Sequence, residues 1–176
     1  TVAATKVLQP FISRAFRRLV TAEETAPYAS LVDLAVSRGE RYEQGLQVAL
    51  SAVLVSPQFL FRIERSAEPD NPKKVVELND YQLASRLSYF IWSSTPDDEL
   101  LALAFDGRLS KPEILRGQVK RMLADPRSQG LVDGFANQWL NLRNLEDVTP
   151  DPNVFPGFND ELKVAMQRET ELFFKT

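Results

Sequence analysis

The 176-residue sequence contains no cysteine and no histidine, and each absence excludes several classes of site. Without cysteine the chain has no disulfide, no thiol nucleophile and no attachment point for c-type haem. Without histidine there is no Cys/His zinc site and no Ser-His-Asp triad. A metal ion would have oxygen ligands alone, which leaves Ca²⁺, Mg²⁺ or Mn²⁺.

Long apolar runs and an excess of basic charge are also missing. The most apolar run, Leu46–Val55, is much shorter than the roughly 20 residues needed to cross a bilayer. The net charge is −3, so the composition does not indicate a nucleic-acid-binding protein. The seven glycines are scattered singly and form no phosphate-binding loop. What remains, 44% apolar and 26% charged residues, is typical of a globular domain.

Apolar residues recur at spacings of three and four, which is the periodicity of α-helices. The first segment carries Leu8, Ile12, Ala15, Phe16 and Leu19 on one face. A later segment repeats the pattern with Tyr42, Leu46, Ala49, Leu50 and Val53. No segment shows sustained alternation of apolar and polar residues. We therefore predict an all-α fold of about eight short helices, packed as an orthogonal or bundle-like array.

Start and stop signals divide this pattern into helices. Thr21-Ala-Glu-Glu24 has the form of a capping box, and Asn79 and Asn159 stand where helix caps are expected. Stops are expected at Arg38-Gly39, Ser56-Pro57, Gly107 and Asp125-Pro126. The polar, proline-containing segment 66–77 is predicted to link an N-terminal submodule, 1–65, to a C-terminal submodule, 78–176, with a shared core. Because the sequence begins at Thr1 and has no stop signal after Phe174, we expect a processed protein or part of a longer one.

Two charged residues lie on or beside apolar helix faces. Glu169 falls in the middle of the apolar side of the last helix, and Arg86 flanks the buried arc of a central helix. A carboxylate on an apolar face must be paired, neutral or exposed at an interface. We predict that Arg86 and Glu169 form a buried or half-buried ion pair. The alternatives are a catalytic Glu169 with a substrate-orienting Arg86, or no contact between them.

Other charged and aromatic residues favour structural roles. Asp97, Asp98 and Glu99 follow a Thr-Pro pair, which is the composition of a helix N-terminus. Arg14, Arg17 and Arg18 are predicted on the solvated face of the first helix, where they could dock an acidic partner. Trp92 and Trp139 are expected in the core. The sequence thus predicts no catalytic residue, no cofactor-binding residue and no metal ligand.

Several stretches resemble a known family of multidomain proteins. "FISRAFRRLVTAEE" and "YEQGLQVALSAVLVSPQFLFRIE" resemble one small module of the planctomycete-type, cytochrome-c-associated proteins. "LNDYQLASRLSYFIWSSTPDDELLALAFDGRLS", "VKRMLADPRSQGLVDGFANQWLNLRNL" and "MQRETELFF" resemble the module that follows it. The resemblance implies an exported protein, periplasmic or extracellular, near electron-transfer proteins, and it transfers no catalytic residue.

Two functions are compatible with these observations. The first is a non-catalytic helical accessory or interaction module, which would dock to other protein subunits, such as those of a cytochrome-containing or membrane-bound complex. The second is a carboxylate-dependent hydrolase or a carbohydrate-binding part of a degradative enzyme, which would need two acids facing one cleft. A structure distinguishes them by showing whether acidic side chains converge in a pocket.

Overall fold

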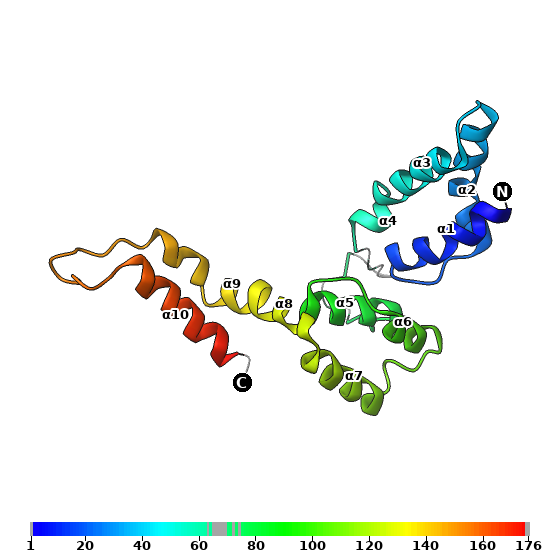
Figure 1. Ribbon diagram of the computed structural model, residues 1–176. Helices are drawn as coiled ribbons and strands as arrows, with labels where there is room; N and C mark the ends of the chain where they lie inside the picture. The colour runs from blue at the N-terminus through cyan, green and yellow to red at the C-terminus, as the bar shows by residue number, and fades with distance from the viewer. Residues whose placement is uncertain (1, 63, 65–69, 72, 74, 175–176) are drawn as a thin grey trace. The chain divides into compact units, whose positions relative to one another are not determined.

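The computed structural model describes residues 2–62, 64, 70–71, 73 and 75–174, which are coloured along the chain in Figure 1. Among these residues the regular secondary structure is helical, without strands, which confirms the predicted all-α class. The chain forms two compact units. Unit 1 comprises Thr1–Arg86 and Thr95–Arg116, and unit 2 comprises Leu87–Ser94 and Gly117–Thr176.

The helices of unit 1 lie mostly in the first half of the chain. They are α1 (Val2–Ala15), α2 (Ala22–Ser37), α3 (Tyr42–Leu54), α4 (Pro57–Leu60), the first part of α5 (Asp80–Trp92), α6 (Asp98–Phe105) and the start of α7 (Pro112–Ala124). The predicted linker, 66–77, falls in part on residues outside the described ones. The predicted submodule boundary and shared core stay predictions.

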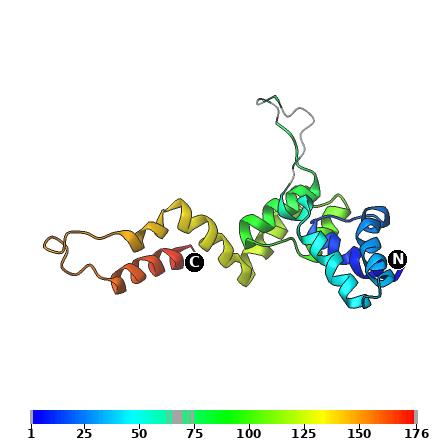
Figure 2. The ribbon, with the colours of Figure 1, turned by 90° about the horizontal axis from the view of Figure 1, so that it is seen from above.

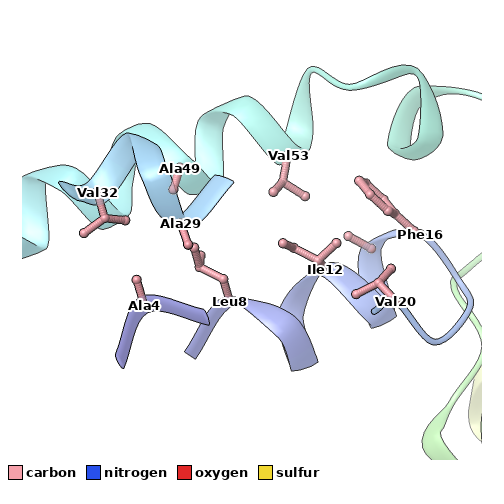
Figure 3. Close-up of a cluster of buried hydrophobic side chains, with 10 residues drawn as sticks. Ala4, Leu8, Ile12, Phe16, Val20, Ala29, Val32, Ala49 and Val53 are labelled. Carbon is pink, nitrogen blue, oxygen red and sulfur yellow. The ribbon is translucent and has the colours of Figure 1, made fainter. Parts of the chain in front are cut away.

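The core of unit 1 forms where α1, α2 and α3 meet (Figure 3). Leu8 and Ile12 of α1 are fully buried against Ala29 and Val32 of α2 and Val53 of α3. Gly45 permits this close approach of α3 to α2, because a Cβ there would lie 3.0 Å from the carbonyl oxygen of Val32. Burial of these side chains follows the predicted helix periodicity and is the main stabilising contribution of unit 1.

Most predicted boundaries of the helices are confirmed. Thr21 accepts a hydrogen bond from the Glu24 amide while the Glu24 carboxylate accepts one from the Thr21 amide, a complete capping box. Gly39 and Gly107 adopt φ of 88° and 62° just after α2 and α6, the left-handed conformation that ends many helices. Pro57 is the first residue of α4. These helix ends are therefore set by residues close to them in the sequence.

The end of α1 differs from the prediction. The helix stops at Ala15, and Arg17 adopts φ 57°, so Leu19 is exposed and lies outside the helix. The amide of Arg18 donates to the carbonyl oxygen of Ser13 at 3.1 Å, which is the pattern of a helix C-terminus with a left-handed residue. Here an arginine occupies the position that glycine usually takes.

Unit 2 contains the end of α5, the rest of α7 and a long helical run. The run comprises a 3₁₀ turn (Pro126–Ser128), α8 (Gln129–Leu131), a π-helical turn (Val132–Ala136), α9 (Asn137–Trp139) and a second 3₁₀ segment (Leu142–Asp147). An irregular loop then leads to α10 (Asp160–Phe173), which returns beside the second 3₁₀ segment (Figures 1 and 2). Within the described residues, no helix combines the length and apolar content needed to span a bilayer.

Trp92 anchors the helical run of unit 2. Its buried indole N–H donates to the carbonyl oxygen of Met122 at 3.0 Å. The Arg127 guanidinium lies 3.6 Å from the Trp92 ring centroid, a cation–π contact. Gly130 allows the run to approach, since a Cβ at this position would lie 2.7 Å from the Trp92 carbonyl carbon. The core role predicted for Trp92 is therefore confirmed.

Candidate functional site

An open groove in unit 1 gathers charged side chains from several elements. It is lined by the turn after α1, the start of α2, the end of α4 and the residues after it, and the N-terminal half of α5 with the residues before it. Four arginines and three glutamates contribute to it: Arg17, Arg18, Arg62, Arg86, Glu24, Glu64 and Glu77. Their pairing determines what the groove can do chemically.

Arg86 pairs with Glu64 in this groove. Nε and Nη2 of Arg86 donate to Oε1 and Oε2 of Glu64 at 2.8 and 2.5 Å, a two-bond arrangement that suits the planar guanidinium. This hydrogen bond from Arg86 lowers the pKa of the Glu64 carboxyl. The Arg86 side chain is 60% exposed in this pair, and the buried or half-buried pair with Glu169 stays a prediction. The helix of Arg86 turns this edge toward the groove and solvent.

The predicted partner of Arg86, Glu169, lies on the exposed surface of α10 in unit 2. Both ends of the Arg86 fork already contact Glu64, so the partner found in the structure differs from the predicted one. Glu64 escaped sequence reasoning because it follows a short apolar segment without helical periodicity. A contact between Arg86 and Glu169 joins two units and stays a prediction.

Arg18 and Glu24 form the second ion pair of the groove. The shorter of their two hydrogen bonds joins Nη2 of Arg18 to Oε1 of Glu24 at 2.6 Å. The hydrogen bond from Arg18, with a further one from the Thr21 amide, lowers the pKa of the Glu24 carboxyl to about 2. Because Glu24 also completes the capping box of α2, the pair fixes the turn between α1 and α2.

Arg17 has a structural role that the sequence pattern did not predict. Its side chain is buried, and its guanidinium donates to the carbonyl oxygens of Gln58, Phe59 and Phe61 at 2.6–3.2 Å. The predicted position on a solvated basic face is therefore wrong for Arg17. The left-handed conformation after α1 turns its side chain toward the end of α4, where backbone carbonyls lack helical partners.

The other members of the predicted basic face are held by carboxylates. Arg14 forms two hydrogen bonds with Asp98, at 3.0 and 2.7 Å, and Arg18 binds Glu24. Docking of an acidic partner by Arg14, Arg17 and Arg18 stays a prediction, and these contacts give it no support. The helix-start interpretation of the acids is confirmed, but the cap is Asp97 and not Thr95, so α6 begins two residues later than predicted: the Asp97 side chain accepts from the Leu100 amide at 3.0 Å.

Unit 2 carries a different kind of surface, made of aromatic side chains. Phe90 contacts Phe135 edge-on with ring centroids 5.5 Å apart, and Phe135 stacks on Trp139 at 5.6 Å. All three are exposed, and Trp139 is 67% exposed. The core position predicted for Trp139 is therefore wrong. We call Phe90, Phe135 and Trp139 the aromatic cluster.

Sequence periodicity could not separate this surface from a core stripe. Phe135 and Trp139 are four residues apart on one helical run, which is the same spacing that buries Leu8 and Ile12 in α1. Within the described residues, no group of three or more acidic side chains is placed to hold a metal ion. The groove and the aromatic cluster are therefore two candidate functional surfaces.

Comparisons with known proteins agree with the module order read from the sequence. One family model, PSD5, described as a protein of unknown function (DUF1595), matches residues 3–64. A second, PSD4, described as a protein of unknown function (DUF1592), matches residues 78–176. No curated protein and no solved structure gives a significant match. Since the second model covers more than half of the chain, the protein belongs to the PSD4 (DUF1592) family and carries a PSD5 (DUF1595) module before that region.

Proposed function

We propose that this chain is a non-catalytic helical interaction module that docks onto other protein subunits. The observation that carries the proposal is the aromatic cluster of unit 2, in which Phe90, Phe135 and Trp139 touch one another and are exposed. Aromatic side chains bury large areas on binding and dominate the energy of many protein interfaces. Three contiguous exposed rings therefore suit a docking site.

The state of the groove in unit 1 supports a non-catalytic role. A glycosidase-type mechanism needs one carboxyl that can donate a proton and a second that acts as base or nucleophile. Arg18 and Arg86 each hold one glutamate of the groove through two hydrogen bonds. These contacts lower the pKa values of Glu24 and Glu64, which disfavours either group as a general acid. The hydrolase alternative therefore gains no support from this groove.

We further propose that the module works outside the cytoplasm, in the periplasm or beyond the cell, with subunits of an electron-transfer complex as partners. The support is the resemblance of its modules to those of exported, cytochrome-c-associated proteins. The family models add that both matched regions have no assigned function. Cell fractionation of the native organism, with antibody detection of the chain, tests the location.

Copurification from native cells tests the docking role. After mild cross-linking, we expect partner subunits to copurify with the tagged wild-type chain. A Phe135→Ser/Trp139→Ser double variant should lose them. Phe105→Ser is the matched control, because Phe105 is an exposed aromatic of α6 in unit 1. Unchanged far-UV circular dichroism and unfolding midpoint show that the double variant is folded. A wild-type chain that remains a monomer without partners contradicts the proposal.

A further inference from the structure

Helix α10 presents its polar side to the rest of unit 2 and its apolar side outward. The side chains of Lys163 and Glu171 are only 14% and 16% exposed, and Gln167 is half-buried on the same side. Lys163 donates from Nζ to the carbonyl oxygen of Glu146 at 3.0 Å. The contacts that hold α10 in place therefore involve polar groups.

Val164 of α10, which is 67% exposed, lies apart from the other five apolar residues of the helix, and those five lie on the side opposite the polar contacts. At about 100° per residue, they fall within an arc of about 120°, and the members of this arc are Leu162, Ala165, Met166, Leu172 and Phe173. Every one of them is exposed, and Phe173 is 77% exposed. The structure describes the whole of α10, and none of its residues is buried. We call these five residues together with Glu169 the α10 face.

This orientation is the reverse of what the hydrophobic effect favours for a helix on a protein surface. A helix of 14 residues is marginal in water by itself and normally gains stability by burying its apolar side. In α10 the poorly exposed side chains are instead those of Lys163 and Glu171, so burial of the apolar side does not stabilise the helix within unit 2. A binding partner that covers the α10 face would therefore stabilise the helix.

Glu169 constrains the chemistry of that partner. By helical geometry it lies between Ala165 and Leu162 in projection, at the middle of the arc. Covering the face would remove this carboxylate from water, which is costly unless a cation lies opposite. Arginine suits the position because its fork binds a carboxylate through two hydrogen bonds. The partner surface should thus be apolar with one central basic side chain.

A second copy of the same helix does not meet this requirement. The basic residues of α10 are Lys163, which lies on the polar side, and Arg168, which contacts Glu171 at 3.2 Å. Two copies of the α10 face would bring two carboxylates into an apolar interface without a cation from either face. The segment 129–174 as a whole has eight acidic and three basic residues, so it also favours a basic partner.

We propose that the α10 face binds an amphipathic helix of another polypeptide, which places an arginine opposite Glu169. The inference rests on the proposed docking role and names the partner chemistry for a second surface of unit 2. Parallel or antiparallel packing of two helices joins such apolar stripes side by side. An amphipathic helix whose apolar side carries a single central arginine is therefore the predicted occupant.

A displayed library of amphipathic helical peptides, with the central position randomised, tests the inference. Wild-type protein should select peptides with Arg or Lys at that position, whereas the Glu169→Lys variant should select Asp or Glu. For a peptide selected by the wild type, Glu169→Gln should weaken binding about tenfold or more. Asp160→Asn, a matched neutralisation on the polar side of α10, should leave the affinity unchanged.

The two methionines report where a selected peptide binds. Met166 lies on the α10 face and Met122 is fully buried, so the methyl signal of Met166 should shift and that of Met122 should not. Absence of enrichment, absence of charge preference, or binding that leaves Met166 unaffected overturns the inference. A dimer that Met166→Glu dissociates would identify a second copy as the occupant and also overturn it. A response of the Met166 signal to Arg86→Gln without peptide would place the occupant within the chain.

The two proposals fail separately. Loss of partners on changing Phe135 and Trp139 tests docking through the aromatic cluster, whatever covers α10. Peptide selection by the α10 face tests the arginine-bearing helix, whatever binds the aromatic cluster.

Discussion

In unit 1 the apolar sides of α1, α2 and α3 meet and bury Leu8 and Ile12 completely, whereas in unit 2 helix α10 buries no residue. Both α1 and α10 carry apolar side chains at spacings of three and four. The difference lies in what each helix contacts. Helix α1 packs its apolar side against α2 and α3, whereas α10 is held to the preceding segment by the hydrogen bond from Lys163 to the carbonyl oxygen of Glu146. An amphipathic pattern therefore predicts a helix and its apolar side, but the same pattern occurs whether that side is core or interface.

The largest predicted effect on stability distinguishes a leucine in the core of unit 1 from a leucine on the exposed α10 face. Leu8→Ala in the core of unit 1 should lower the free energy of unfolding by about 2–5 kcal/mol, since it leaves a cavity among buried side chains. Leu162→Ala on the α10 face should change it by about 0.5 kcal/mol or less. Urea unfolding followed by far-UV circular dichroism measures both. Equal losses of stability would show that Leu162 is buried in the free chain and would contradict the exposed position of the α10 face.

Removing the buried arginine of unit 1 should give the next effect. Arg17→Met takes away the donors that Gln58, Phe59 and Phe61 use, so stability should fall by about 1–3 kcal/mol. Arg14→Met is the matched control, and its effect should be smaller because the Arg14–Asp98 pair is exposed. The same unfolding measurement checks both variants. A larger loss for Arg14→Met would contradict the structural role of Arg17.

Two glycines of unit 2 differ in the space around them. Gly130→Ala should destabilise by about 1–3 kcal/mol, because the new Cβ meets the Trp92 backbone. Gly117→Ala on α7, where a Cβ meets nothing within 4 Å, should stabilise by about 0.4–1 kcal/mol. Tryptophan fluorescence follows unit 2, which contains both tryptophans. The same sign for both substitutions would argue against the close contact at Trp92.

Acid should weaken each unit through its ion pairs, and in each unit one carboxyl has a pKa of about 2. The pKa of Glu24 in unit 1 falls from 4.5 to about 2 through Arg18, and that of Asp125 in unit 2 falls from 3.8 to about 2 through Arg127. A carboxyl whose pKa is lower in the folded than in the unfolded chain stabilises the fold at pH values above its unfolded pKa. This stabilisation is lost as the pH falls toward the folded pKa of about 2. For Glu24, with a side chain 40% exposed, the screened contribution is about 0.2–1 kcal/mol.

Substitution of the arginines separates the two units in this test. Arg18→Gln should flatten the pH dependence of stability below about pH 4.5 in unit 1, which the hydrogen exchange of α2 amides measures. Arg127→Gln should do so in unit 2, followed by tryptophan fluorescence. A pH profile that is the same in wild type and variants would show that these ion pairs do not contribute to the loss of stability in acid.

Local signals predicted much of the fold. The capping box at Thr21, the caps at Asn79 and Asn159, the glycine turns at 39 and 107 and the start at Pro57 all depend on neighbouring residues. Arg17 was misplaced because its left-handed φ moves it out of the helical projection. Glu64 was missed as the partner of Arg86 because the contact joins residues 22 positions apart, and no periodic pattern marks such a pair.

Backbone preferences and helical periodicity are local, so the amino-acid pattern predicts the helical class, most helix ends and the place of Glu169 on an apolar side. The pattern does not predict that Trp92 is buried while Trp139 is exposed, that Arg17 binds backbone carbonyls, or that α10 faces outward with its apolar side. Burial depends on which elements pack together, and these contacts join segments far apart in the chain.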